Sequence, residues 1–260
     1  MPSQHTRISI IGCGHVGTSC AYAILQNHLA REIVLIGDTE DHVHGEALNL
    51  QQALGTPVKI FAGTYKDAAA SSIVIMTVGT PAKFSGSRLD MLAGNVCIVR
   101  SCIQKLMAEG FDGVLVIATN PVDVLTFIAQ GESGLPASQV IGSGTLLDTE
   151  RLRHILGERL NVDPRSVHAA VIGEHGDSSV AVWSAAQVAG VPLALYPGVD
   201  TLPSQEELLA SVRHAGPEVA SLKGNTCFAI ASCVTRPSRK KMSRARSVSP
   251  REYISGTSTD

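Results

Sequence analysis

The sequence predicts an α/β protein: a Rossmann-type doubly wound parallel sheet followed by a second, α+β domain. Short β-branched apolar runs alternate with helical segments in the first half of the chain, and a glycine-rich turn follows the first run. The length of 260 residues exceeds that of a usual single domain, which favours two. A hydrophobic content of 44% with 17% charged residues suits well-filled cores.

Five apolar runs are the expected strands of the sheet. They are apolar throughout rather than alternating, which is typical of strands buried on both faces and joined by right-handed helical crossovers. The runs are RISIIG (7–12), EIVLIG (32–37), PVKIF (57–61), SSIVIMTVG (71–79) and GVLVIATN (113–120).

The segment GCGHVG (12–17) after the first run has the spacing of a dinucleotide-binding turn. Its three glycines permit a tight turn, close approach of the backbone to a pyrophosphate and close packing of the helix that follows. Because strand, turn, helix and a second strand ending in Gly37-Asp38 occur in order, we favour a dinucleotide site over an ordinary glycine turn.

A second region starts near residue 143. It has a helical pattern through residue 160, an apolar run HAAVIG (168–173), and further helical patterns around 181–189 and 204–235. The regular alternation of strand and helix ends here, which indicates a separate α+β domain.

The composition changes after Arg236. Residues 236–260 carry seven Lys and Arg against two Asp and Glu, whereas residues 1–235 carry 14 against 21. The tail has no core-forming face, so it is expected to be disordered and solvated rather than a nucleic-acid arm. The predicted divisions are residues 1–142, 143–236 and 237–260.

Three polar residues mark the second region as a site of chemistry. Asp148 and Arg151 lie in GTLLDTERLR (144–153), and His175 lies in VIGEHGDSS (171–179). A guanidinium can hold a carboxylate, and an imidazole paired with an acid can move a proton near neutral pH. Taken singly, such residues are more often a surface histidine and an ordinary helical ion pair.

Charge and cysteine usage exclude several classes. A net charge of −2 argues against a nucleic-acid or membrane-surface protein, and the first apolar run is too short for a signal peptide or a membrane span. We therefore expect a cytoplasmic enzyme. The six cysteines show no CxxC pair or metal-ligand rhythm, so we expect reduced core thiols and no metal site.

These residues together resemble the lactate branch of the lactate/malate dehydrogenase family. The resemblance covers about residues 7–236, and several of its motifs are specific to the family. They are IGCGHVG, ATNPVDVLT (118–126), VIGSGTLLDTERLR (140–153), IGEHGDSS (172–179), VWS (182–184) and KGNT (223–226).

The resemblance implies reversible hydride transfer between L-lactate and NAD, giving pyruvate and NADH, as in glycolysis and pyruvate fermentation. His175 would exchange the proton, Asp148 would hold its imidazole, and Arg151 would grip the substrate carboxylate. Arg88 would polarise the carbonyl from a mobile loop. The remaining substrate residues would be Asn120, Thr226 and Ala82. The coenzyme residues would be Gly12, Gly14, His15, Val16, Gly17, Gly37, Asp38, Gly79, Thr119 and Asn120.

Three departures from the family qualify this picture. Gly37 stands where most relatives carry the ribose-binding acid, although Asp38 follows and would repel the 2′-phosphate of NADP. Ala82 replaces the glutamine of lactate enzymes and the arginine of malate enzymes. The family's final strands and helix are expected after Arg236 and do not follow in the sequence, so the catalytic domain is predicted to be incomplete and turnover poor.

The resemblance also implies regulation and assembly. Arg153 and His168 match the basic pair that binds fructose 1,6-bisphosphate between subunits of allosteric relatives, although Arg153 could equally be a helix-surface charge and His168 a strand-end residue. The segment GEALNLQQAL (45–54) matches a helix that packs between subunits in the family's dimers and homotetramers. Two other functions stay open: a dehydrogenase for another uncharged L-2-hydroxy acid, and a truncated, inactive member of the family.

Overall fold

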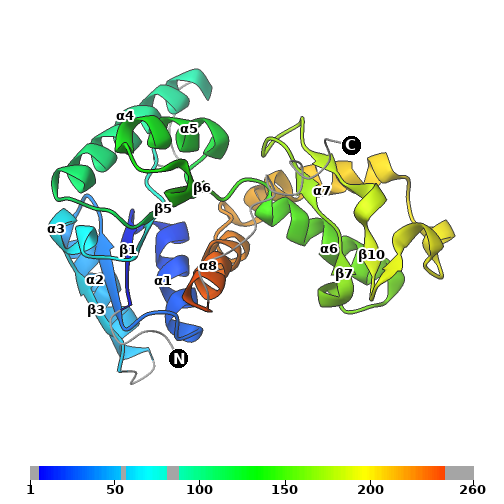
Figure 1. Cartoon of the computed structure of the whole chain (residues 1–260), viewed down its shortest axis with the longest axis horizontal. Coiled ribbons are helices and arrows are strands. Elements are labelled where there is room, and N and C mark those ends of the chain that lie inside the picture. The colour runs from blue at the N-terminus through cyan, green and yellow to red at the C-terminus, as the bar shows by residue number, and fades with distance from the viewer. Residues whose placement is uncertain (1–5, 54–56, 81–87, 244–260) are drawn as a thin grey trace, which may run out of the picture.

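The computed structural model describes residues 6–53, 57–80 and 88–243, and the side chains in these ranges apart from 88–90 and 236–243. A six-stranded, wholly parallel sheet has the strand order β3-β2-β1-β4-β5-β6 (Figure 1). Its strands are β1 (Arg7–Ile11), β2 (Glu32–Ile36), β3 (Lys59–Ala62), β4 (Ile73–Met76), β5 (Val114–Ile117) and β6 (Val140–Gly142). The first five confirm the predicted runs.

Strand β1 lies at the point where the strand order reverses. Ile10 pairs with Leu35 of β2 on one side and with Ile75 of β4 on the other. In open parallel sheets, ligands bind outside the carboxyl ends of the strands at this reversal. The glycine turn follows β1 and therefore lies at that position.

Helices cover both faces of the sheet, as the continuously apolar strands predict. Successive residues of β1 point to opposite faces: Ile8 and Ile10 into one core, Ile11 into the other. The first face is covered by α1 (His15–Gln26), α2 (Glu40–Gln52) and α8 (Phe228–Ser243). The second is covered by α3 (Tyr65–Ala69), α4 (Arg88–Ala108) and α5 (Val122–Ser133).

The second domain packs helices α6 (Leu146–Leu160) and α7 (Gln205–Lys223) against short strands. These strands are β7 (Val167–His168), β8 (Val171–Ile172), β9 (Val180–Ala181), β10 (Gln187–Val188) and β11 (Val191–Pro192). The 3-10 turns are η1 (Ala137–Gln139), η2 (Pro164–Ser166), η3 (Trp183–Ala185), η4 (Leu193–Leu195) and η5 (Val199–Thr201). The helix predicted at 181–189 is wrong, because this segment holds part of β9, η3 and β10.

Helix α8 departs from the predicted domain division. Gly224, with φ +84°, ends α7, so the helical pattern at 204–235 forms two helices. Although α8 follows the second domain in sequence, Ala231 and Val234 join the sheet's core beside α1 (Figure 1). The helix also runs to Ser243, into the segment predicted as disordered from residue 237; residues 244–260 lie outside the described ranges.

The cysteines are free thiols, and all but Cys97 are buried. Burial raises the pKa of both Cys13 and Cys20 to about 12, so these thiols stay protonated. Among the described residues, no helix is long and apolar enough to cross a membrane.

Candidate active site

The glycine turn is closed against the end of β4. Gly12 has φ +105°, and a Cβ there would lie 2.7 Å from the backbone nitrogen of Val78. A Cβ at Gly17 would lie 1.8 Å from the carbonyl oxygen of Gly12, so α1 meets the strand only because residue 17 is glycine. The Thr77 hydroxyl donates to the Gly12 carbonyl at 2.7 Å and closes the turn.

The other side of this turn is open. A Cβ at Gly14 would meet no atom within 4 Å. Gly14 also provides no side-chain cap for α1, whose first turn contains no acid, so its backbone N–H groups can bind an anion. The turn therefore fits a dinucleotide pyrophosphate, with His15 and Val16 in the first turn of the helix.

The ribose end of the predicted site lies after β2. Gly37 and Asp38 are both exposed there. A Cβ at Gly37 would lie 2.6 Å from Cγ2 of Val43, so α2 occupies the space that a side chain at 37 would need. Asp38 is therefore the acid available at the end of this strand.

Asn95, a buried residue of α4, links the ends of β4 and β5. Its Oδ1 accepts from the backbone nitrogen and hydroxyl of Thr80 at 2.8 and 2.9 Å, and its Nδ2 donates to the Asn120 carbonyl at 2.8 Å. The Thr119 hydroxyl donates to Val78 O at 2.6 Å. These bonds hold Gly79, Thr119 and Asn120 at the same edge of the sheet as the glycine turn.

The predicted catalytic residues come together in the second domain. Asp148, in the first turn of α6, is only 5% exposed, and its Oδ2 lies 2.5 Å from Nδ1 of His175 in the loop between β8 and β9. Its Oδ1 accepts from Nη1 of Arg151 at 3.2 Å. One buried carboxylate therefore orients both the imidazole and the guanidinium.

This arrangement favours the protonated imidazole. The hydrogen bond to Asp148 is the largest influence and raises the pKa of His175 above its ordinary value of 6.5. Desolvation and the charge of Arg151 lower this pKa, while the charges of Asp148 and Asp123 raise it. An imidazole held in this way is suited to donate and accept a proton near neutral pH.

The candidate catalytic loop, residues 173–179 between β8 and β9, has its backbone fixed at both ends. At its start, the Thr145 and Thr149 hydroxyls donate to Val171 O at 2.7 and 3.2 Å, and Val171 N donates back to Thr149 Oγ1 at 2.9 Å. At its end, Arg213 of α7 donates to Ser179 Oγ at 3.2 Å. Inside the loop, His175 N donates to Oδ2 of Asp123 at 2.8 Å.

A glycine of α7, Gly216, lies next to the guanidinium of Arg151 and leaves space for it. A Cβ at Gly216 would lie 3.2 Å from Nη2 and 3.5 Å from Nη1 of Arg151. The position of this cation therefore depends on glycine at residue 216.

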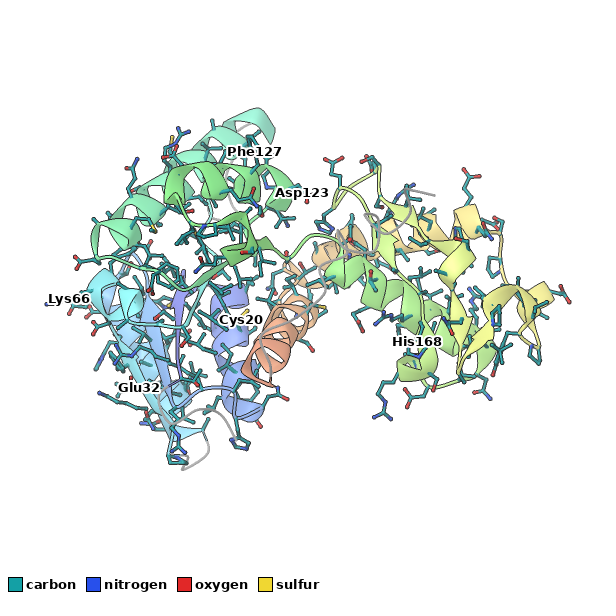
Figure 2. The ribbon with its side chains drawn as sticks, in the orientation of Figure 1. Cys20, Glu32, Lys66, Asp123, Phe127 and His168 are labelled. Carbon is teal, nitrogen blue, oxygen red and sulfur yellow. The ribbon has the colours of Figure 1, made fainter. Side chains whose placement is uncertain are left out.

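One predicted effector residue, Arg153, is bonded to the backbone beside the other, His168. Arg153 donates to the carbonyl of Ala169 at 2.9 Å and pairs with Glu150 at 3.1 Å. His168, next to Ala169, is exposed on β7 (Figure 2). Arg153 of α6 is therefore attached to the segment that carries His168.

Two predicted substrate residues cannot be placed. Ala82 lies outside the described residues, and the side chain of Arg88, the first residue of α4, does as well. Thr226 is half-buried between α7 and α8. The sequence did not single out Asn95, Asp123 or Thr77 as parts of the site, because each acts on a backbone group far away in the chain.

Sequence profiles match both domains. The lactate/malate dehydrogenase NAD binding domain matches residues 6–142, and the alpha/beta C-terminal domain of the same family matches residues 145–256. The second match passes Arg236, where the sequence predicts the family pattern to end.

Individual relatives agree with the profiles. The chain is 43% identical to an L-lactate dehydrogenase of Staphylococcus saprophyticus, over 88% of this chain and 73% of the relative. It is 41% identical to one of Streptococcus gordonii, over 95% and 77%. A crystal structure of minor L-lactate dehydrogenase from Enterococcus mundtii, in a ligands-bound form, is 39% identical, with a TM-score of 0.87 over 92% of this chain and 78% of that one.

Proposed function

The chain belongs to the lactate/malate dehydrogenase family, and from this premise we propose that it is an NAD-dependent L-lactate dehydrogenase. It interconverts L-lactate and NAD with pyruvate and NADH. The observation that carries the proposal is the 2.5 Å contact between His175 Nδ1 and the buried carboxylate of Asp148, with Arg151 on the other oxygen of that carboxylate.

Each residue of the site has a separate role in this proposal. NAD, held by the glycine turn (residues 12–17), would supply the hydride acceptor for C2 of the hydroxy acid. His175 takes the hydroxyl proton on Nε2, because Nδ1 is engaged by Asp148, and Asp148 stabilises the imidazolium that results. Arg151 turns its planar guanidinium to the substrate carboxylate and binds it through two parallel hydrogen bonds.

Three further residues complete the substrate site in this proposal. Arg88 polarises the carbonyl from the start of α4. Asn120, held through its backbone by Asn95, orients the carbonyl or the nicotinamide, and Thr226 forms part of the substrate wall.

The preferred substrate is a 2-oxo acid with an uncharged side chain, pyruvate or one slightly larger. A second carboxylate would need a cationic partner inside a closed site, because an unpaired buried charge is very costly. Ala82 provides no such cation. A dehydrogenase for another uncharged L-2-hydroxy acid is the alternative that this position favours.

The preferred coenzyme is NAD rather than NADP. The profile that matches residues 6–142 is that of an NAD-binding domain. Asp38, one residue after the strand end, binds the ribose hydroxyls in this proposal and repels a 2′-phosphate.

Assembly and location are further parts of the proposal. We infer a cytoplasmic dimer or tetramer in which α2 packs against a second copy, since Leu48 of that helix is 49% exposed. In the tetramer, Arg153 and His168 face their symmetry mates and bind fructose 1,6-bisphosphate.

A panel of substrates and coenzymes tests the proposal. With purified protein, kcat/KM should be highest for pyruvate or a slightly longer uncharged 2-oxo acid, and lower for oxaloacetate. Calorimetric titration should show tighter binding of NADH than of NADPH. Preference for oxaloacetate would indicate a malate-type enzyme, and tighter binding of NADPH would contradict the role of Asp38.

A further inference from the structure

Asp123 joins the two domains at the catalytic histidine. It lies in the first turn of α5, which begins two residues after Asn120, at the end of α5 nearest the second domain (Figure 2). Its Oδ2 accepts a hydrogen bond from the backbone nitrogen of His175 at 2.8 Å, across 52 residues of sequence.

An acid in the first turn of a helix commonly serves only that helix, by facing its positive end. Asp123 can do so as well, but one oxygen of its carboxylate is bonded to a segment of the other domain. The catalytic loop is therefore held at two atoms of one residue: the ring of His175 by Asp148 of α6, and its backbone by Asp123 of α5.

Among the described side chains, three charged groups act on the imidazole of His175. Asp148 and Arg151 face it from α6, and Asp123 faces it from α5. The negative charge of Asp123 favours the protonated ring, as that of Asp148 does, while the guanidinium opposes it. Asp123 thus both binds the backbone of His175 and raises the pKa of its imidazole.

We propose that Asp123 is a positioning residue for proton transfer: it ties the coenzyme domain to the backbone of His175 and fixes the imidazole relative to the coenzyme edge of the sheet. This role rests on the proposed dehydrogenase function. It requires both an acceptor atom and a negative charge, and the two requirements can be separated by substitution.

Two substitutions of Asp123 separate the need for an acceptor atom from the need for a negative charge. Asp123→Asn keeps an oxygen that can accept from His175 N but removes the charge, whereas Asp123→Ala removes both. Glu206→Gln is the matched control, because Glu206 is also a first-turn acid, on α7. For each protein, kcat/KM for pyruvate is measured against pH with NADH.

On the acid plateau, where His175 is protonated, the alanine variant should lose about tenfold in kcat/KM, the scale of one hydrogen bond to a charged group. The asparagine variant should stay within about threefold of the wild type, since it keeps the acceptor. Both should lower the inflection pH, more strongly at low salt, and Glu206→Gln should change neither quantity. An alanine variant with unchanged plateau and inflection would overturn the proposal.

A second measurement does not depend on turnover. In the coenzyme-free protein, NMR titration should give a lower pKa for His175 in both Asp123 variants, and faster solvent exchange of its backbone amide in the alanine variant alone. If the wild type failed to reduce pyruvate, these results would still decide the role of Asp123. An unchanged pKa together with unchanged amide exchange would reject it.

Discussion

Nδ1 of His175 lies 2.5 Å from Oδ2 of Asp148, although 27 residues separate them in sequence. This contact joins the loop after β8 to the first turn of α6, and it brings together the proposed proton carrier and the only buried carboxylate among the described residues of the second domain. Most of the predictions below depend on it.

The first prediction concerns pH. Because the pKa of His175 is raised above 6.5, its ion pair with Asp148 stabilises the fold fully below the unfolded pKa, and this contribution is lost as pH rises through the folded pKa. The kcat/KM for pyruvate reduction, which needs the protonated ring, should fall over the same range.

The Asp148→Asn variant checks this assignment. It removes the largest cause of the raised pKa, so the inflection for pyruvate reduction should move to lower pH, and kcat should fall by roughly two orders of magnitude. Asp163→Asn, in an exposed ion pair with Arg165, is the control and should leave the profile unchanged. An inflection at the same pH in Asp148→Asn would show that another group titrates.

The second prediction concerns Arg151. Arg151→Lys keeps the charge but loses the planar fork, so KM for pyruvate should rise about tenfold or more, with a smaller change in kcat. Steady-state kinetics measure the two constants separately. Arg165→Lys, at an exposed site, should leave both unchanged, and a normal KM in Arg151→Lys would place the substrate carboxylate elsewhere.

The third prediction concerns Gly216. In Gly216→Ala the new Cβ would lie 3.2 Å from Nη2 of Arg151, closer than ordinary contact, so the guanidinium must move by a few tenths of an ångström. A rise in KM of about threefold to tenfold is expected, since misplacement of a binding group weakens catalysis. Gly131→Ala in α5 is the control, because a Cβ there meets no atom within 4 Å. Equal kinetics in the two variants would exclude crowding of Arg151.

The fourth prediction concerns the effector. Fructose 1,6-bisphosphate should lower KM for pyruvate or promote assembly, and Arg153→Ala or His168→Ala should abolish the response, because each removes basic groups facing the phosphates. His154→Ala, an exposed neighbour on α6 paired with Glu158, should preserve it. An assembled wild-type protein whose kinetics do not change at about millimolar effector, the scale of a weak site, would count against the site.

The sheet could be predicted because its strands are short and apolar on both faces. Strand β6 was not among the predicted strands because its three residues are too few for a pattern. The segment 181–189 is rich in alanine, a composition that favours a helix. In the structure, Ala189 with φ +50° and Gly190 with φ +87° form a tight turn between β10 and β11. Gly190 is a local sign of a turn, but the type of residue 189 does not indicate the left-handed conformation of Ala189.

The placement of α8 required three-dimensional information. Cys227, Ala231 and Val234 form an apolar stripe at helical spacing, which predicts one buried face but does not say which domain covers it. In the site, the types of His175, Asp148 and Arg151 predict that they act together, and the structure brings the three side chains into contact. Asp123 and Asn95 could not be found in this way, because they bind backbone atoms, and backbone atoms leave no pattern in the sequence.

The central claim is that His175 transfers the proton in NAD-dependent interconversion of lactate and pyruvate. The most direct measurement is the steady-state rate of NADH oxidation by pyruvate. Wild type and His175→Ala are compared at NADH concentrations that saturate both proteins. We predict slow but measurable turnover by the wild type and a kcat lower by roughly two or more orders of magnitude in the variant, with NADH binding retained. Near-normal turnover by His175→Ala would contradict the account.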